Sequence, residues 1–242
     1  LKFSRVGLGT GMRGSNRQSN QTRLGKEEFE TLLRTSYERG VRWYDMADLY
    51  GSHPYLIPAL NGVKRDKYSI VSKIWFLPHG IPETERPDAD VVVERFLKEL
   101  GTDHLDILLL HCLTDPAWTG KMQDTMEVLS RAKQKGTIRT FGVSCHDLGA
   151  LKAAVESPWT EVILARLNHA GVAMDAEPPV VAPLLKKAHD SGKAVIAMKI
   201  AGAGRLRDQI DQSLQYVLGR GCVDAFTMGF ESARELDQVF DK

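Results

Sequence analysis

The segment Ile107-Leu108-Leu109-Leu110-His111-Cys112 is a short apolar run that ends on two residues whose side chains can take part in catalysis or metal binding. A β-strand with one wet face alternates apolar and polar residues, whereas a strand buried on both faces is apolar throughout. Strands of the second kind are typical of parallel sheets that are covered on both sides. The segment therefore predicts a buried parallel strand that carries His111 at its carboxyl end.

The same pattern repeats along the 242 residues, with amphipathic helix patterns in the gaps. We predict strands at 6–11, 41–47, 68–75, 105–112, 140–145, 161–168, 194–200 and 223–229. Eight such strand–helix units in a chain of this length predict an α/β fold, a TIM-type (β/α)8 barrel that forms one domain over residues 1–242. A doubly wound open sheet is the alternative, but 7–11, although rich in glycine, lacks the spacing of a dinucleotide fingerprint.

Composition excludes several classes of protein. Lys and Arg total 32 against 31 for Asp and Glu, which gives a net charge of +1. The chain therefore lacks the excess of basic residues that is typical of proteins that bind nucleic acid or an anionic membrane. No apolar run approaches the roughly 20 residues of a membrane span. Cys112, Cys145 and Cys222 make no disulfide framework. We expect a cytoplasmic location by default, leave a native leader before Leu1 open, and make no prediction about oligomeric state.

Four titratable residues, Asp45, Tyr50, Lys73 and His111, fall at or just beyond the carboxyl ends of three successive predicted strands. A barrel keeps its active site at this end. A lysine inside an apolar run needs a partner, and Asp45 lies one strand away. A nearby ammonium lowers the pKa of a phenol from about 10, so Tyr50 is predicted to be the acid/base. A neutral His111 would orient a carbonyl oxygen.

The segment Asp45-Met46-Ala47-Asp48-Leu49-Tyr50-Gly51 resembles the signature of the aldo-keto reductase superfamily, Asp-Thr-Ala-x-x-Tyr-Gly. Lys73 in Ser-Lys-Ile-Trp and His111 in Leu-Leu-Leu-His match two further family positions, and 7–10 and 142–144 also match. The resemblance covers nearly the whole chain. It implies a barrel that binds NADPH or NADH and interconverts a small aldehyde or ketone with its alcohol.

In that family the tyrosine is the general acid, the lysine lowers its pKa, the aspartate pairs with the lysine, and the histidine orients the substrate. The resemblance also implies that Trp75 lines the substrate pocket, whereas Asp48 is expected to be a loop residue and not a catalyst. The cofactor site implied by the family consists of Gly9, Thr10, Ser144, Met198, Lys199, Gly202, Gly204, Gly229, Phe230, Glu231, Ser232 and Glu235.

Several positions of the cofactor site depart from the family pattern. The usual serine–asparagine pair reads Ser144-Cys145. The glutamine of strand 6 aligns with Leu164, the aromatic that stacks on nicotinamide aligns with Met198, and the tryptophan of the first loop aligns with Gly11. These departures predict intact acid/base machinery beside an altered nicotinamide cradle.

The residues after strand 8 predict a cofactor preference. Members of the family that prefer NADPH carry basic residues there, whereas this chain has Glu231 and Glu235. A carboxylate accepts a hydrogen bond from a free ribose hydroxyl and repels a phosphate. We therefore expect no strong preference for NADPH and a possible preference for NADH. Two alternatives stay open: Arg234 binds the phosphate, or Glu235 only completes a capping box with Ser232.

Two other functions compete with a reductase. The pairs His111-Cys112, Cys145-His146 and Asn168-His169 place potential metal ligands at three strand ends, as in a barrel hydrolase. Adjacent strand residues point in opposite directions, so each pair offers one inward ligand, and we expect no metal. The altered cradle also leaves open a barrel that binds a dinucleotide as a sensor, without turnover.

Overall fold

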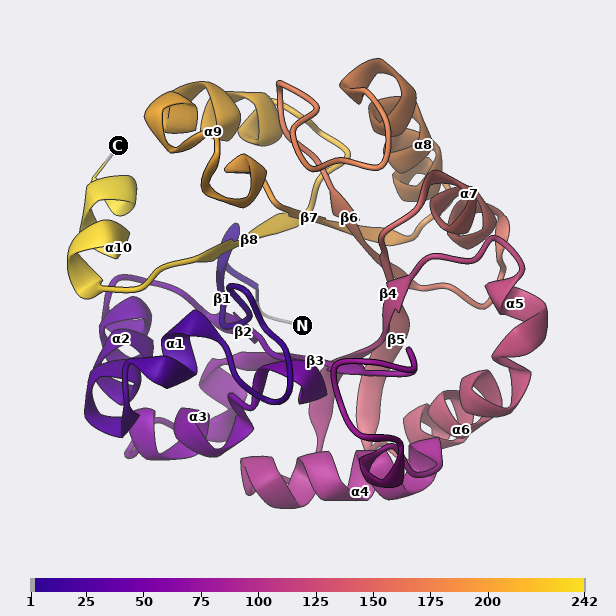
Figure 1. Cartoon of the computed structure of the whole chain (residues 1–242), viewed down its shortest axis with the longest axis horizontal. Coiled ribbons are helices and arrows are strands. Elements are labelled where there is room, and N and C mark those ends of the chain that lie inside the picture. The colour runs from indigo at the N-terminus through magenta and orange to yellow at the C-terminus, as the bar shows by residue number, and fades with distance from the viewer. Residues whose placement is uncertain (1–2, 242) are drawn as a thin grey trace.

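The computed structural model describes residues 3–241 and forms a closed barrel of eight parallel strands in chain order, with β8 paired to β1. The strands surround the barrel axis in Figure 1, and the helices surround the strands. The predicted (β/α)8 architecture is confirmed, and the open sheet is excluded. The strands are β1 (Val6–Gly9), β2 (Trp43–Asp45), β3 (Ser69–Ile74), β4 (Leu105–Leu113), β5 (Ile138–Cys145), β6 (Val162–Arg166), β7 (Ala194–Met198) and β8 (Ala225–Gly229).

Helices connect successive strands, as the amphipathic patterns predicted. They are α1 (Asn20–Arg23), α2 (Lys26–Glu38), α3 (His53–Ala59), α4 (Ala89–Leu100), α5 (Trp118–Lys121), α6 (Gln123–Gln134), α7 (Leu148–Glu156), α8 (Pro178–Asp190), α9 (Ile210–Leu218) and α10 (Ala233–Phe240). Helix α1 lies between β1 and α2, where Ser19 and Thr22 form a capping box at its N-terminus. Within residues 3–241, no helix has the length and apolarity that crossing a bilayer would require.

The inside of the barrel is filled by an apolar layer to which three of the strands contribute two side chains each, and a ring of polar residues lies above it. The layer contains Trp43, Val71, Ile107, Leu109, Val162, Leu164, Ile196, Met198 and Ala225. Side chains on one face of a strand recur every second residue. Asp45, Lys73 and His111 each follow an inward-facing residue by two positions, so they also face the inside of the barrel. Ser144 is in register with Leu164, and Arg166 follows Leu164 on the same face.

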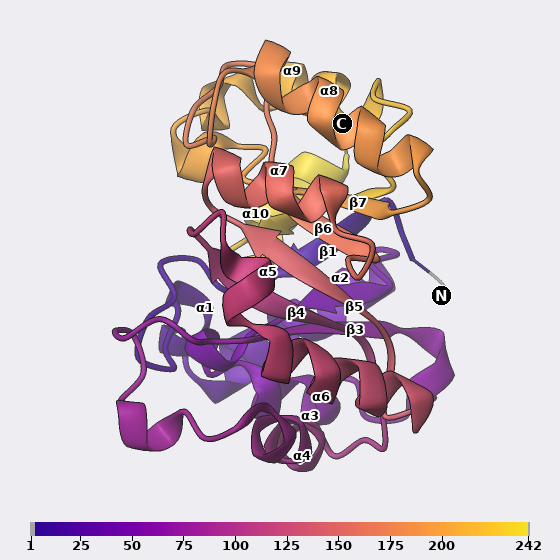
Figure 2. The same cartoon turned by 90° about the vertical axis from the view of Figure 1, so that its right-hand side faces the viewer.

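The parallel strands bring all their carboxyl ends to one end of the barrel, where the polar ring lies. Two long loops follow β1 and β3 there, and they extend to the left in the side view of Figure 2, opposite the N-terminus. The structure thus places Asp45, Tyr50, Lys73 and His111, which we call the tetrad, at the end of the barrel that the sequence predicted.

Candidate active site

Lys73 and Asp45 form a buried ion pair inside the mouth of the barrel. The Lys73 ammonium donates hydrogen bonds to the Asp45 carboxylate and, at 2.9 Å, to the Met46 carbonyl oxygen. Lys73 is 1% exposed and Asp45 is 6% exposed. Burial lowers the pKa of Lys73, and the Asp45 charge opposes this shift. The pairing that the apolar surroundings of Lys73 predicted is therefore present.

Tyr50 ends a one-turn 3-10 helix, η1 (Asp48–Tyr50), just beyond β2. Its hydroxyl hydrogen-bonds with Nε2 of His111 at 3.3 Å, and the Lys73 Nζ lies 4.9 Å from the ring centroid. Burial raises the pKa of Tyr50 well above 10.0, with further contributions from Asp45 and Cys112. The lowering of the pKa that was expected from Lys73 does not outweigh this rise, because burial of the phenol is its largest cause. Tyr50 is therefore a protonated donor at neutral pH.

His111 is a neutral imidazole. Burial lowers its pKa well below 6.5, and the charges of Lys73 and Lys199 contribute to the same shift, as does His146. The Trp75 ring stands nearly perpendicular to His111, with 5.1 Å between the ring centroids. Trp75 thus lies beside the catalytic candidates, where the resemblance implied a substrate pocket.

The first loop covers one side of the Tyr50 ring. A Cβ atom added at Gly11 would lie 2.2 Å from Tyr50 Cζ, and one added at Gly14 would lie 2.5 Å from Tyr50 Cδ1. The backbone at both glycines therefore packs directly against the ring. This contact explains why Gly11 cannot be a tryptophan while Tyr50 keeps its present position, and sequence reasoning had no account of Gly14.

Cys112 is a site residue that the sequence did not predict as such. Its φ of +61° is left-handed, so its side chain leaves the ordinary alternation of β4. It packs with Tyr50 against the apolar cluster of Leu49, Trp75 and Ile81. Burial raises the pKa of its thiol, so Cys112 contributes an apolar wall beside Tyr50 and no nucleophile.

The ends of β5 and β8 carry hydroxyl groups without partners among the described residues. Ser144 Oγ and Thr227 Oγ1 are buried, and neither makes a hydrogen bond. Cys145 packs into the core outside the barrel, so only the serine of the expected pair faces the mouth. A free hydroxyl at Ser144 fits an amide ligand, because a buried polar group without a partner is costly until something binds it.

Arg166 is the first of two cationic residues in the half of the barrel mouth that is formed by the ends of β5 to β8. Arg166 Nη2 donates to the His146 carbonyl oxygen at 2.7 Å and pairs with Asp175, while its Nε is buried without a partner in the described chain. Arg166 was not among the predicted site residues, although it is a charge at the end of an apolar strand, which is the feature that singled out Lys73.

Lys199 is the second of these residues, and it directly follows β7. It has a left-handed φ of +56° and no ion-pair partner within residues 3–241. Its carbonyl oxygen accepts hydrogen bonds from Gly202 N at 2.8 Å and from Asn168 Nδ2 at 3.1 Å, which hold the turn in place. Desolvation lowers the pKa of Lys199, and the charge of Arg166 adds to this shift.

Several predicted cofactor residues have partners within the protein. Thr10 donates to the Asp45 carbonyl oxygen at 2.9 Å, and Phe230 is buried against Phe240. Met198 belongs to the apolar layer inside the barrel. Gly9 packs closely on β8, since a Cβ there would lie 2.9 Å from Thr227 Oγ1.

Glycines with left-handed φ follow β7. They are Gly202 at +57° and Gly204 at +88°, and no atom lies within 4 Å of a Cβ built at Gly204. Gly229, in contrast, is closely packed, because a Cβ built there would lie 2.5 Å from Met12 Cγ. The turn after β7 is therefore open at Gly204, whereas the end of β8 is packed against the first loop.

The acidic residues after β8 are hydrogen-bonded within the protein. Glu231 Oε1 accepts from Asn20 Nδ2 at 2.5 Å, and Glu235 Oε2 accepts from Glu231 N at 2.8 Å. Ser232 Oγ accepts from Glu235 N at 3.2 Å. The predicted capping box is thus half formed, because the Glu235 side chain reaches Glu231 N in place of Ser232 N.

The proposed metal-ligating pairs do not converge. Among the described residues no three His, Cys, Asp or Glu side chains are grouped as a metal site would require. Cys145 faces the outer core, and His169 hydrogen-bonds with Ser213 Oγ and Gln209 Oε1, each at 3.1 Å. The metal-dependent hydrolase therefore has no geometric support in residues 3–241.

The family model of the aldo/keto reductase family matches residues 5–238. The chain belongs to this family. Curated relatives include "Methylglyoxal reductase YeaE" of Escherichia coli, 28% identical over 214 residues that cover 84% of this chain and 66% of the relative. "Aldo-keto reductase AFTS1" of Alternaria alternata is 27% identical, with coverage of 84% and 63%. The chain thus spans about two thirds of the length of these relatives.

Solved structures show the same fold. A putative aldo-keto reductase from Pseudomonas aeruginosa aligns with a TM-score of 0.79 at 22% identity, over 99% of this chain and 89% of that one. The aldo-keto reductase AKR11C1 from Bacillus halodurans, solved in its holo form, aligns with a TM-score of 0.74 at 20% identity, over 100% and 87%. At these identities the likeness establishes the barrel alone.

Proposed function

We propose that this protein reduces a small aldehyde or ketone to its alcohol with a nicotinamide cofactor, and that Tyr50 is the general acid. One observation carries the proposal: the Tyr50 hydroxyl lies 3.3 Å from a neutral His111, beside the buried Lys73–Asp45 pair. The family match and the name of the E. coli relative support the reaction class.

The chain's own residues divide the chemistry among them. His111 stays uncharged and orients the carbonyl oxygen by a hydrogen bond. Tyr50 gives its proton to that oxygen, and the nearby Lys73 ammonium stabilises the phenolate left behind. Asp45 keeps Lys73 in place. Trp75 and Cys112 form apolar walls of the pocket.

The residues of the opposite half fit a reduced nicotinamide dinucleotide, which supplies a hydride to the carbonyl carbon when it is bound. Ser144 offers its free hydroxyl to the carboxamide. The turn after β7, with Gly202, Gly204 and Lys199, would hold phosphate groups through backbone N–H groups and the ammonium. We propose that neither cofactor is strongly preferred and that NADH is favoured, since Glu231 and Glu235 both lie after β8.

Turnover of methylglyoxal and a panel of small aldehydes tests the proposal, with NADH and NADPH compared at one salt concentration. Methylglyoxal is the first compound because of the relative's name. We expect loss of reduced cofactor with wild-type protein and none with Tyr50→Phe. Tight dinucleotide binding without turnover of any carbonyl compound would instead support a sensing barrel, which the departures at Cys145, Leu164 and Met198 favour.

A further inference from the structure

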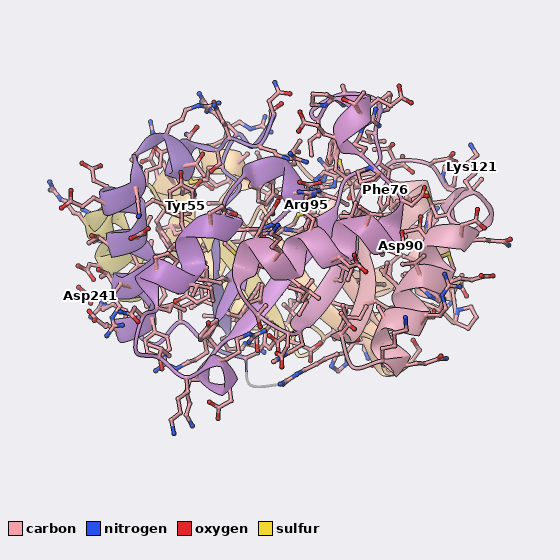
Figure 3. All side chains as sticks on the ribbon, turned by 90° about the horizontal axis from the view of Figure 1, so that it is seen from below. Tyr55, Phe76, Asp90, Arg95, Lys121 and Asp241 are labelled. Atoms are coloured by element: carbon pink, nitrogen blue, oxygen red, sulfur yellow. The ribbon has the colours of Figure 1, made fainter. Side chains whose placement is uncertain are left out.

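Asp48 is almost completely buried and is held by two arginines from different parts of the chain. Its side chain is 3% exposed. Arg95 of α4 donates from Nη1 to Oδ1 at 2.9 Å and from Nη2 to Oδ2 at 2.7 Å, which is a bidentate pair. Arg17 of the first loop donates from Nε to Oδ1 at 3.1 Å. Arg95 is labelled on α4 in Figure 3.

The same short helix carries Tyr50 two residues later. A 3-10 turn of three residues has poor hydrogen-bond geometry and little intrinsic stability. Within η1 and its cap the backbone bonds are Tyr50 N to Ala47 O at 3.1 Å and Gly51 N to Asp48 O at 3.3 Å. The bidentate Asp48–Arg95 pair therefore ties this turn to α4 in addition to the two backbone hydrogen bonds of the turn itself.

Arg17 links the turn to the loop that covers it. Its guanidinium also donates to Glu85 in the loop after β3, from Nη1 to Oε2 at 2.6 Å. Gly51 has a left-handed φ of +63°, and a Cβ there would lie 1.9 Å from the Arg17 carbonyl oxygen. Together with the packing of Gly11 and Gly14 on the ring, these contacts fix the Tyr50 turn from two sides.

We propose that Asp48 is a positioning residue for Tyr50: by binding Arg95 and Arg17 at once, it holds the phenol at His111 and fastens the first loop over it. This inference rests on the proposed function for its kinetic consequence, but its structural consequence is independent of turnover. Asp48 itself touches neither Tyr50's hydroxyl nor the mouth.

A second buried aspartate that is held by two arginines, Asp106, serves as a matched control for Asp48. Asp106 is 1% exposed, pairs with Arg65 at 2.7 Å and lies 3.4 Å from Arg139. It stands at the start of β4, at the far end of the barrel from Tyr50. A loss of stability common to both carboxylates can thus be separated from an effect on the site.

The experiment compares Asp48→Asn with Asp106→Asn in two measurements. In steady-state kinetics we expect Asp48→Asn to lower kcat by roughly 10- to 100-fold, because small misplacements of a reacting group have effects of this size. Cofactor affinity should stay unchanged, Asp106→Asn should keep kcat within about twofold, and Asp48→Glu should recover part of the loss.

The second measurement is the ¹⁵N resonance of the His111 ring, assigned by its loss in His111→Asn. We expect it to move in Asp48→Asn and to stay in place in Asp106→Asn, because only the former releases the Tyr50 hydroxyl. An unmoved resonance in Asp48→Asn, or equal shifts in both variants, overturns the proposal. Absence of carbonyl reduction by wild-type protein would contradict the proposed function, while the resonance would still test Asp48.

Discussion

The two halves of the barrel mouth differ in how completely their polar groups are paired. At the ends of β2 to β4, Lys73 is paired with Asp45 and Tyr50 hydrogen-bonds with His111. At and just beyond the ends of β5, β6 and β8, four buried polar atoms lack partners among the described residues: Ser144 Oγ, His146 Nδ1, Arg166 Nε and Thr227 Oγ1. In the first half, His111 Nδ1 also lacks one. An unpaired buried group costs about 1–3 kcal/mol.

This difference separates chemistry from binding. The first half is already arranged for proton transfer and needs no ligand to assemble it. The second half has hydrogen-bonding capacity that the described residues leave unused, together with Lys199, which has no ion-pair partner among them. Substitutions in the first half should therefore change rate or stability, and those in the second should change cofactor affinity.

The largest effect is expected from Tyr50→Phe. Loss of a general acid lowers rates by about 10²–10⁴-fold, and the ring itself still fills its place against Gly11 and Gly14. The rate of carbonyl reduction in a single turnover measures the effect, with dinucleotide affinity as the control. Turnover within threefold of wild type, with chemistry limiting, would mean that another group supplies the proton.

Asp45→Ala should lower stability as well as rate. It leaves the buried Lys73 ammonium without its counter-charge, and breaking such a pair costs roughly 3–5 kcal/mol. Denaturant unfolding measures the loss, and the double variant Asp45→Ala/Lys73→Met should regain most of it. An unchanged free energy of unfolding in Asp45→Ala would show that the pair is solvated.

Sequence alone predicted the barrel and the tetrad because both depend on local patterns. Buried strands are continuous apolar runs, and a charge ending such a run, as at Lys73, needs a partner nearby. It could not predict the state of Tyr50, since the pKa depends on how completely the first loop buries the ring. Nor could it predict the partners of Asp48, because Arg17 and Arg95 lie 31 and 47 positions away.

Ser144→Ala should weaken binding of the dinucleotide without affecting the tetrad. A single hydrogen bond contributes about 0.5–1.5 kcal/mol, which corresponds to roughly two- to tenfold in affinity. Fluorescence titration with NADH measures it. ADP-ribose, which lacks nicotinamide, is the control ligand and should bind both proteins equally. A parallel loss of ADP-ribose affinity would place Ser144 away from the carboxamide.

A smaller effect is expected at the end of β8. In the proposed binding mode, Glu231→Gln removes a carboxylate near the ribose and should raise NADPH affinity by about two- to fivefold, an effect typical of charges at the surface. Asp237→Asn on α10, the helix that follows Glu231, is the control and should leave NADPH affinity unchanged. If wild-type protein binds NADPH more than tenfold tighter than NADH, the proposed preference is wrong and Arg234 or Arg205 holds the phosphate.

The central claim is that a protonated Tyr50 stands ready beside a neutral His111, and the pH dependence of reduction in a single turnover tests it most directly. The pKa of Tyr50 is raised above 10.0 and that of His111 is lowered below 6.5, so the acid form of one and the neutral form of the other coexist between these values. Activity should be lost as pH falls through the lowered pKa of His111, or as pH rises through the lowered pKa of Lys73 and the raised pKa of Tyr50. We predict a level rate from pH 6.5 to the pH at which Lys73, whose pKa lies below 10.5, loses its proton. A sigmoidal change with its midpoint inside that range would contradict the account.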